Sequence, residues 1–396
     1  MQESPLAQRI SLLQGEGAYK VLAQATALEA QGRNIIHLEI GQPNFHTPLN
    51  IQQAAFQAIA DGKTGYTAAQ GLLETRQAIT EYCLKYKQVK TNPEEIVVTP
   101  GAKPIIFFTM LALINPGDEV ICPNPGFPTY ASCIHFTGGK EVALKLITEN
   151  QFQPDPAELK SLLNEKTKLV ILNNPSNPTG HMMSKERMLE LVEIIRDNSN
   201  AFILCDEIYD RLIFDQTEAL SSAAVEGMKD RTILLDGFSK TYAMTGWRLG
   251  YGVMQAKIAE AFSTLMVNSN GCAASFSQIA AIEALRGPQD SVEMMCSAFA
   301  ERSMWLAKAL NQIDGIECLM PNSAFYVFPS VKKTGISSAN FADRLLKEAG
   351  VAVLDGESFG IYGKGHLRLS TANSMENIQA AATRIAAFTA GLQKGV

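Results

Sequence analysis

Long hydrophobic runs are missing from this sequence of 396 residues, since no apolar stretch approaches the roughly 20 residues that cross a bilayer. Residues 1–9 are polar and lack the apolar core of a signal peptide. Basic side chains are also few, because 34 Lys and Arg are outnumbered by 40 Asp and Glu, and this argues against a broad surface for nucleic-acid phosphates. These absences predict a cytoplasmic protein with no membrane or nucleic-acid partner.

Cysteine is sparse and dispersed. The seven cysteines form no Cys-x-x-Cys pair, which predicts reduced thiols packed as small apolar residues instead of a disulfide framework or a metal site. A Gly-x-Gly-x-x-Gly turn after a strand is missing, and this argues against a dinucleotide-binding oxidoreductase. Neither end carries an added basic helical region, so a ligand-sensing domain fused to a DNA-binding module is disfavoured.

From residue 95 onward the sequence contains short apolar segments that alternate with helical patterns. Near-continuous apolar runs are typical of strands buried on both faces, and helices between them favour a mostly parallel sheet. Intervening helices are expected at residues 104–114 and 185–198. The predicted fold class is α/β, with a seven-stranded sheet between helices whose strands are residues 96–99, 120–122, 142–146, 169–172, 202–205, 232–235 and 249–254.

The two ends of the chain show weaker α+β patterns. Strands are expected at residues 35–40, 324–328 and 367–370, and helices at residues 18–31, 51–60, 71–86, 256–285, 291–312, 338–349 and 376–392. We therefore predict a large α/β domain over residues 50–285 and a small α+β domain built from residues 16–49 and 286–396. Residues 1–15 are expected to form an N-terminal arm.

One lysine stands in a polar loop between two strand patterns. Lys240 follows the strand at residues 232–235, and Arg248 follows eight residues later, with small residues between them. A lysine beside a packed sheet suits imine chemistry, because desolvation lowers its pKa and frees the amine lone pair. Taken alone, Lys240 is better explained as a solvated loop residue, and the imine interpretation depends on the rest of the chain. Arg248 is either an ordinary ion-pair residue or a planar fork for a phosphate.

Polar residues follow two neighbouring strands. Asn177 lies in the segment Asn-Pro-Ser-Asn-Pro-Thr-Gly after the strand at residues 169–172, which is either a turn or an amide at the carboxyl edge of a parallel sheet. Asp206 ends the strand at residues 202–205, and Tyr209 follows it. The carboxylate either caps a helix or holds a cationic ring nitrogen, and Tyr209 would add a phenol to the same site.

Three further segments have chemistry-bearing residues. Gly101, Ala102 and Lys103 join a strand to a helix start, where backbone N–H groups can approach an anion, although a plain tight turn explains them equally well. Phe127 ends the next strand and either folds over the core or stacks on a flat ligand. Arg368 lies on the polar side of an alternating strand, and a solvated face is the alternative.

These residues stand at successive strand ends. Gly101, Phe127, Asn177, Asp206 and Lys240 together supply a phosphate seat, a ring stack, a partner for a phenolic oxygen, an acid for a ring nitrogen and an amine. A pyridoxal phosphate site requires this set of groups. The ordered set therefore predicts pyridoxal 5'-phosphate as cofactor, although each residue alone is weak evidence.

The sequence resembles the class I/II pyridoxal-phosphate-dependent aminotransferases of fold type I, the aspartate aminotransferase-like family. The resemblance covers nearly the whole chain, from residues 38–43 to Arg368, and is strongest in residues 174–180 and 239–251, where Lys240, Gly246 and Arg248 are in register. It implies the fold-type-I architecture, transamination between an L-amino acid and a 2-oxo acid such as 2-oxoglutarate, and a homodimer with shared active sites. In that dimer Tyr66 would reach the phosphate bound by the neighbouring subunit.

The resemblance also implies roles for single residues. Lys240 would bind the cofactor covalently and move the substrate Cα proton, and Asp206 would pair with the ring nitrogen. The remaining carried-over positions are those that hold the phenolic oxygen (Asn177, Tyr209), stack on the ring (Phe127), grip the phosphate (Gly101, Ala102, Lys103, Arg248) and bind the substrate (Arg368 and Gly41 at its α-carboxylate, and Asn177). Ser239 is a further candidate cofactor contact.

The family pattern is broken at three positions, and substrate choice stays open. Gly237 stands where many relatives carry serine, Asp355 precedes Gly356 where proline is common, and Ser323 stands where glycine often precedes Ala-Phe-Tyr. Lys103 is either a reader of a distal carboxylate, which would favour aspartate or glutamate, or a solvated helix-start lysine. A β-eliminating lyase of sulfur amino acids needs the same Lys240 and Asp206, so it is the alternative activity.

Overall fold

The structure is a computed structural model and describes residues 5–214 and 218–394. Its centre is a seven-stranded sheet of order β2-β8-β7-β6-β5-β3-β4, in which β8 runs antiparallel to both neighbours and all other strands point the same way. The predicted mostly parallel sheet is therefore confirmed. Its strands are β2 (Ile96–Thr99), β3 (Glu119–Asn124), β4 (Lys140–Lys145), β5 (Thr167–Asn173), β6 (Phe202–Asp206), β7 (Thr232–Gly237) and β8 (Gly250–Val253).

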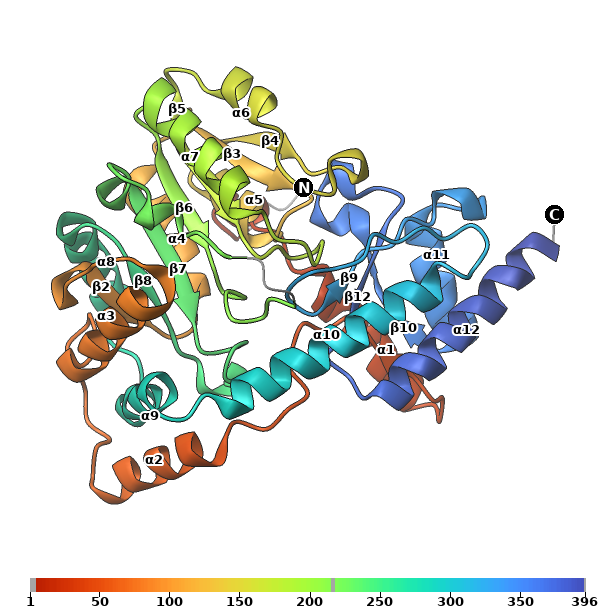
Figure 1. Cartoon of the computed structure of the whole chain (residues 1–396), viewed down its shortest axis with the longest axis horizontal. Coiled ribbons are helices and arrows are strands. Elements are labelled where there is room, and N and C mark those ends of the chain that lie inside the picture. Colours follow the sequence, from red (N-terminus) through yellow and green to blue (C-terminus); the bar gives the residue numbers. More distant parts are fainter. Residues whose placement is uncertain (1–4, 215–217, 395–396) are drawn as a thin grey trace.

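Helices cover both faces of this sheet (Figure 1). Successive strand residues point to opposite faces: in β5, Leu169 and Ile171 pack with helices α4, α5 and α8, whereas Val170 and Leu172 pack with α7. Because both faces are covered, the strands read as continuous apolar runs. The flanking helices are α3 (Leu73–Lys87), α4 (Lys103–Leu113), α5 (Thr129–Phe136), α6 (Pro156–Leu162), α7 (Lys185–Asn198), α8 (Ala256–Ser269) and α9 (Ser275–Arg286).

Two smaller sheets join the two ends of the chain. β1 (Ile36–His37) pairs in parallel with β10 (Val351–Ala352), and β12 (Leu367–Ser370) lies between β11 (Leu354–Asp355) and β9 (Tyr326–Val327) in an antiparallel sheet. A separate apolar core holds these sheets to their helices. The helices on this side are α1 (Gly17–Glu29), α10 (Asp290–Leu310), α11 (Ser338–Arg344) and α12 (Met375–Lys394) (Figure 1).

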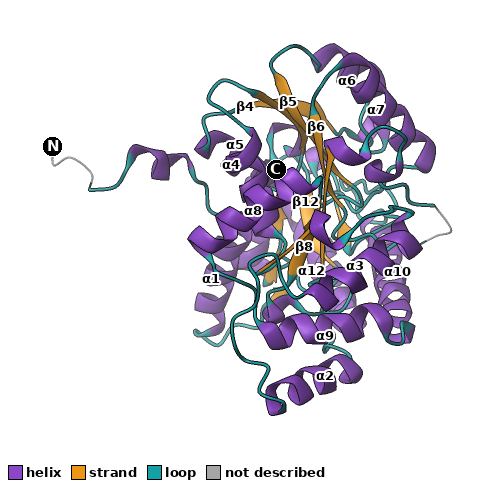
Figure 2. Cartoon of the chain, turned by 90° about the vertical axis from the view of Figure 1, so that its left-hand side faces the viewer, coloured by secondary structure: helices purple, strands orange, loops and turns teal. Residues whose placement is uncertain are grey.

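Two segments lie at the periphery. The described part of the N-terminal arm extends outward from the body of the molecule, with its 3₁₀ helix η1 (Gln8–Leu12) next to α5, and α2 (Leu49–Ala60) lies against α9 at the outer edge (Figure 2). Short helical turns fill several connections: η2 (Pro93–Glu95), η3 (Thr148–Asn150), η4 (Ser222–Ala224), η5 (Lys229–Arg231), η6 (Thr245–Trp247), η7 (Lys332–Thr334), η9 (Gly356–Phe359) and η10 (Ile361–Gly363).

Several predicted elements need correction. The continuous helix expected over residues 256–285 is wrong, because Gly271 adopts φ 76° between α8 and α9. The helix expected over residues 338–349 changes after Arg344 into a π-helical turn, η8 (Leu345–Ala349). The strand expected at residues 35–40 is only β1, and α5 and α6 were not predicted because both are short and irregularly patterned.

Within the described part of the chain, no helix combines the length and the apolar character that crossing a membrane requires.

Candidate active site

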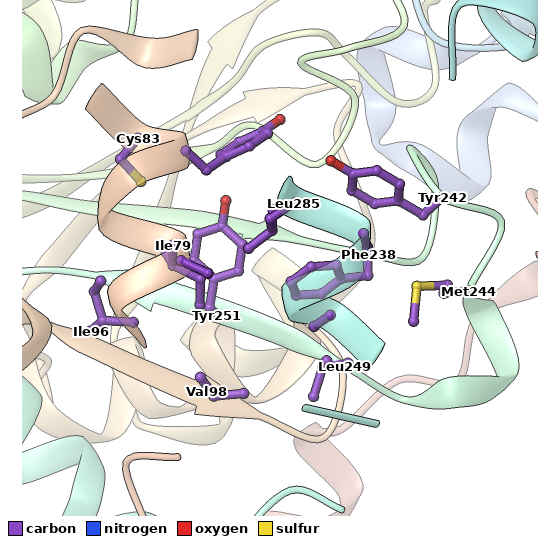
Figure 3. Close-up of a cluster of buried hydrophobic side chains, with 14 of the residues drawn as sticks. Ile79, Cys83, Ile96, Val98, Phe238, Tyr242, Met244, Leu249, Tyr251 and Leu285 are labelled. Atoms are coloured by element: carbon purple, nitrogen blue, oxygen red, sulfur yellow. The ribbon is translucent and has the colours of Figure 1, made fainter. Parts of the chain in front are cut away.

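The loop that carries Lys240 is anchored by its apolar neighbours. Phe238 is fully buried directly after β7, and Tyr242, Met244 and Leu249 are buried in the same cluster beside α3 and α9 (Figure 3). Phe238 packs against the ring of Tyr242, with 5.9 Å between ring centroids. Residues on both sides of Lys240 are thus held by the core, so the lysine projects from a fixed backbone.

Lys240 is half-buried, and its amine donates a hydrogen bond to the backbone carbonyl of Gly41. Burial, followed by the positive charges of Arg368, Arg248 and Lys103 in that order, lowers the pKa of Lys240 to about 8. A lysine with this pKa has a neutral, nucleophilic fraction near neutral pH. The solvated-loop alternative for Lys240 is therefore wrong.

Asp206 ends β6 as a buried carboxylate. Its Oδ2 accepts a 2.6 Å hydrogen bond from the Tyr130 hydroxyl, and its Oδ1 accepts one from the Ile208 backbone N–H at 3.2 Å. Burial raises the pKa of Asp206 to about 6, although the bond from Tyr130 works in the opposite direction. A buried carboxylate of this kind is stabilised by any cation placed beside it. Tyr130 was not predicted from the sequence; the only signal was its place three residues after Phe127.

Arg368 of β12 and Asn177 meet across the site. Arg368 is buried, and one of its terminal nitrogens donates to the Asn177 side-chain oxygen at 3.2 Å while the other donates to the Glu39 carbonyl. The Arg368 Nε has no hydrogen-bond partner. The solvated-face alternative for Arg368 is wrong, because its guanidinium points into the interior. Its unpartnered Nε is a donor available to an anionic ligand.

Two tyrosines bridge the two halves of the site. The hydroxyls of Tyr209 and Tyr326 lie 2.7 Å apart, and the guanidinium carbon of Arg368 lies 4.6 Å from the Tyr326 ring centroid. Gly41 approaches this pair so closely that a Cβ there would come within 2.1 Å of the Tyr326 hydroxyl. Gly41 therefore allows residues 41–43 to lie against Tyr326. Tyr326 was not predicted as a site residue, because it lies within an ordinary strand pattern.

The turn after β2 forms a cradle for an anion. Gly101 has φ 87°, a conformation that favours glycine, and the Arg248 guanidinium lies where a Gly101 side chain would stand. A Cβ on Gly250 would come within 2.5 Å of the Ala102 backbone nitrogen, so β8 and this turn approach closely only because Gly250 has no side chain. Arg248 is exposed and donates to the Thr245 carbonyl at 2.9 Å. These groups can together hold a phosphate.

Lys103 opens α4 beside Phe127. Its ammonium lies 5.5 Å from the Phe127 ring centroid and forms an ion pair with Glu16, which precedes α1. The Phe127 ring in turn meets Tyr130 edge to face at 5.7 Å. Lys103 is exposed at the start of α4, as the solvated alternative expects, and it also has a carboxylate partner. Glu16 was not predicted, and its N-terminal segment has no motif.

Two predicted residues lie less centrally. Ser239 is buried next to Lys240. The side chain of Tyr66 is 99% exposed, so it does not pack into the site of its own chain.

A buried ionic cluster supports the loops behind the site. The Lys87 ammonium, from the end of α3, lies 2.9 Å from Glu207 and 3.0 Å from Asp236 and also contacts Asp210. Burial lowers the pKa of Lys87, but the three carboxylates outweigh this and hold it well above its usual range. Burial, and then the charge of Asp210, raises the pKa of Asp236 to about 7. One lysine thus ties together the loops of Asp206 and Lys240.

Two of the three departures from the family pattern have structural reasons. A Cβ on Gly237 already lies 3.0 Å from the Gly250 backbone, so a larger side chain is disfavoured there. Ser323 is fully buried and donates to the Gly180 carbonyl at 3.2 Å, which ties β9 to the loop of Asn177. The third departure, Asp355, has no structural explanation, although Gly356 after it lies against the carbonyls of Gly363 and His366 with no room for a side chain.

Comparison with known proteins places this site in a family. The family described as aminotransferase class I and II matches residues 33–385. The chain belongs to the class I and II aminotransferases. The family and fold predicted from the sequence are thus confirmed, and the chain is an aminotransferase.

The relatives of this aminotransferase are named after different amino-acid substrates. It is 38% identical to an aspartate aminotransferase of Bacillus sp. (strain YM-2), and 38% identical to an asparagine–oxo-acid transaminase of Streptococcus mutans; each alignment covers 97% of this chain and 98% of the relative. It is 35% identical to the aromatic aminotransferase structure from Pyrococcus horikoshii OT3, with a TM-score of 0.89 over 95% of this chain and 100% of that chain. The names of the relatives therefore do not decide the substrate, and the side chains at the site have to indicate it.

Proposed function

We propose that this aminotransferase binds pyridoxal 5'-phosphate at Lys240 and exchanges an amino group between an L-amino acid and a 2-oxo acid such as 2-oxoglutarate. The observation that carries the proposal is the convergence of Lys240, Asp206 and Arg368 at the carboxyl end of the parallel sheet. The amine has a lowered pKa, the acid is buried without a cation touching it, and the arginine has a free donor.

The residues present fit this cofactor. Arg248 and the backbone of Gly101 and Ala102 form a cradle suited to its phosphate, and the positive φ of Gly101 keeps that cradle clear of a side chain. Asp206 offers the buried carboxylate that a protonated ring nitrogen needs, and Phe127 offers an aromatic face. Asn177 and Tyr209 are the nearby amide and phenol that we assign to its phenolic oxygen.

When bound, the cofactor supplies an aldehyde and an electron-withdrawing ring that stabilises negative charge at the substrate Cα. The residues of this chain bind and orient the substrate. Arg368, through its free Nε and its terminal nitrogens, holds the α-carboxylate, and the segment at Gly41 borders the same space. Fixing that carboxylate selects which Cα bond reacts, and good orientation contributes up to roughly 7–11 kcal/mol in intramolecular reactions.

Lys240 moves the proton. Its amine, with a pKa of about 8, would accept the substrate Cα proton as a base and then donate it as an acid to C4′ of the cofactor, with the opposite transfer in the second half-reaction. The nearby cations Arg368 and Arg248 keep the amine partly neutral at neutral pH, because a second positive charge beside them is unfavourable. Asp206 stays ionised beside a ring cation and so maintains the electron-withdrawing ring.

We assign the amino donor to the aspartate or glutamate class, with 2-oxoglutarate as acceptor. Lys103 at the start of α4 is the group that would read a distal carboxylate, and the Bacillus relative is named an aspartate aminotransferase. Two-substrate exchange of this kind follows a ping-pong cycle, since the same pocket serves donor and acceptor in turn.

We further propose the domain division given by the sequence, with residues 50–285 as the large domain and residues 16–49 and 286–396 as the small one. The seven-stranded sheet lies within the first range, and both smaller sheets lie within the second. We also place the protein in the cytoplasm, which the seven free thiols support.

A homodimer is the third part of the proposal. The arm, α2 and the loop that follows α2 expose large apolar side chains in the single chain, including Leu6 (63%), Phe56 (66%) and Tyr66 (99%). Exposed apolar residues concentrated on projecting segments are typical of a subunit interface. A second copy of this chain would cover them, and Tyr66 would then reach the phosphate of the partner's site.

Absorbance spectra of the purified protein test this function. We expect a cofactor band that is replaced by the pyridoxamine band when the correct L-amino acid is added, and that returns with 2-oxoglutarate. In Lys240→Ala we expect turnover to be lost while the cofactor binds noncovalently. Normal steady-state turnover by Lys240→Ala would refute the assignment. Release of pyruvate or sulfide from cysteine-type substrates without an oxo acid would instead indicate the lyase.

A further inference from the structure

Glu16 lies at the candidate site although it belongs to the N-terminal segment. It occupies the N-cap position of α1, yet its side chain makes no capping hydrogen bond there. Its carboxylate instead accepts from the Lys103 ammonium and lies 3.4 Å from the Thr129 hydroxyl. An acid at an N-cap usually binds the free backbone N–H groups of its own helix. The Glu16 carboxylate instead pairs with Lys103, which lies 87 positions away in the sequence.

The pair faces the same space as the reactive groups. Lys103 lies 5.5 Å from the Phe127 ring centroid, and both members of the pair act on the charge of Lys240: Lys103 lowers the pKa of Lys240, whereas Glu16 raises it. Glu16 also contributes to the raised pKa of Tyr326. The ion pair therefore lies beside the Phe127 ring, and its charges act on the amine of Lys240 and on Tyr326.

A transaminase pocket must accept two different substrates in turn. An uncharged substrate side chain beside Lys103 would displace water from the ammonium and supply no counter-charge, which is unfavourable. Glu16 supplies that counter-charge within this chain. A dicarboxylate brings its own distal carboxylate, which can take the place of Glu16 on Lys103.

We propose that Glu16 is a specificity-determining residue. It pairs with Lys103 when the substrate side chain is uncharged, and the distal carboxylate of a dicarboxylate replaces it as the partner of Lys103. This inference rests on the proposed function, since it assigns the substrate classes of that site. Glu16 thereby allows the pocket to accept uncharged amino donors in addition to the aspartate or glutamate class and the dicarboxylic oxo-acid acceptor proposed above.

The ion pair between Glu16 and Lys103 is weak enough to be broken and replaced. The Lys103 side chain is 45% exposed and that of Glu16 is 21% exposed, and ion pairs with such access to water contribute little stability. Gly15 and Gly17 flank Glu16, and the described residues before it, 5–15, have no buried side chain. A small shift of this segment is therefore enough to release Lys103.

The test compares the holoenzyme with Glu16→Gln, Lys103→Met and the double variant. The specificity constant, the rate constant divided by KM, is measured for aspartate and for alanine in single-turnover experiments. We expect Glu16→Gln to raise the ratio of the aspartate value to the alanine value about tenfold. The double variant should show no such rise, because the gain depends on Lys103. Calorimetry with succinate, which has no amino group to react, should show about fivefold tighter binding to Glu16→Gln than to wild type.

Two results would overturn the proposal. One is an unchanged ratio and unchanged succinate affinity in Glu16→Gln, and the other is the same rise in the Lys103→Met background. Failure of the proposed function looks different, because then no amino acid would change the spectrum of the wild type. The succinate titration would still report on Glu16 in that case, since it needs no turnover.

Discussion

At the scale of single residues, the site combines an acid and an amine whose pKa values burial shifts in opposite directions. Asp206 has its pKa raised to about 6, and Lys240 has its pKa lowered to about 8. Each shift favours the neutral form, because the ionised form of both side chains is destabilised when no ligand is bound. Groups with such shifts concentrate at functional sites, because the ligand supplies the missing counter-charge.

Asp206→Asn is expected to stabilise the cofactor-free protein at neutral pH. The folded-state pKa of about 6 lies above the ordinary 3.8, so the stability that Asp206 contributes is present below pH 4 and lost as the pH rises through 6. The difference in the free energy of unfolding between Asp206→Asn and wild type should therefore grow by about 3 kcal/mol from pH 4 to pH 7. Chemical denaturation at several pH values measures it.

The matched control is Asp61→Asn, a carboxylate exposed at the end of α2. A difference for Asp206→Asn that stays constant with pH, or that follows the same course as that of Asp61→Asn, would speak against the buried-carboxylate assignment.

At the scale of elements, the sequence predicts most of what places the site. The strand patterns locate Asp206, Asn177 and Lys240 at the ends of β6, β5 and β7, since apolar runs and polar ends follow directly from burial in a parallel sheet. The partners that complete the site are less visible, because Tyr130 and Glu16 reach it through tertiary contacts between segments distant in sequence. No local pattern encodes such a contact.

The buried cluster beneath the site should depend on Lys87. Lys87→Met leaves three carboxylates without a cation in the interior, and removing one partner of a buried pair typically costs about 3–5 kcal/mol. We expect a loss of this size in the free energy of unfolding, measured by urea denaturation. Lys85→Met is the control, since Lys85 lies exposed on the same helix. Equal effects of the two substitutions would contradict a role for the cluster.

The close approach of β8 to the turn after β2 should set phosphate affinity. In Gly250→Ala the new methyl group would meet the Ala102 backbone and push the turn away, at a cost of about 1–3 kcal/mol. We expect pyridoxal phosphate to bind about tenfold more weakly, a change of about 1.4 kcal/mol, with a smaller effect on pyridoxal, which has no phosphate. Fluorescence titration of cofactor-free protein measures both.

Gly246→Ala is the control for this change, because no atom lies within 4 Å of a Cβ built there. Equal weakening for pyridoxal and for pyridoxal phosphate in Gly250→Ala would show that the phosphate seat is not what the substitution disturbs.

At the scale of the whole molecule, the projecting arm and α2 leave apolar side chains uncovered in the single chain (Figure 2). We expect Phe56→Asp to shift the protein from dimer to monomer in sedimentation velocity and to lower its turnover, because the charge would be buried in the interface. Leu189→Asp, on the exposed face of α7, is the control. A wild type that sediments as a fully active monomer would exclude the shared-site dimer.

The assignment of Lys240 is tested most directly by chemical trapping. The holoenzyme is reduced with borohydride, digested, and its peptides are examined by mass spectrometry. We expect the added mass of the reduced cofactor on the peptide that contains Lys240 and, in Lys240→Ala, on no peptide. Added mass on another lysine, or none in the wild-type holoenzyme, would contradict the role of Lys240.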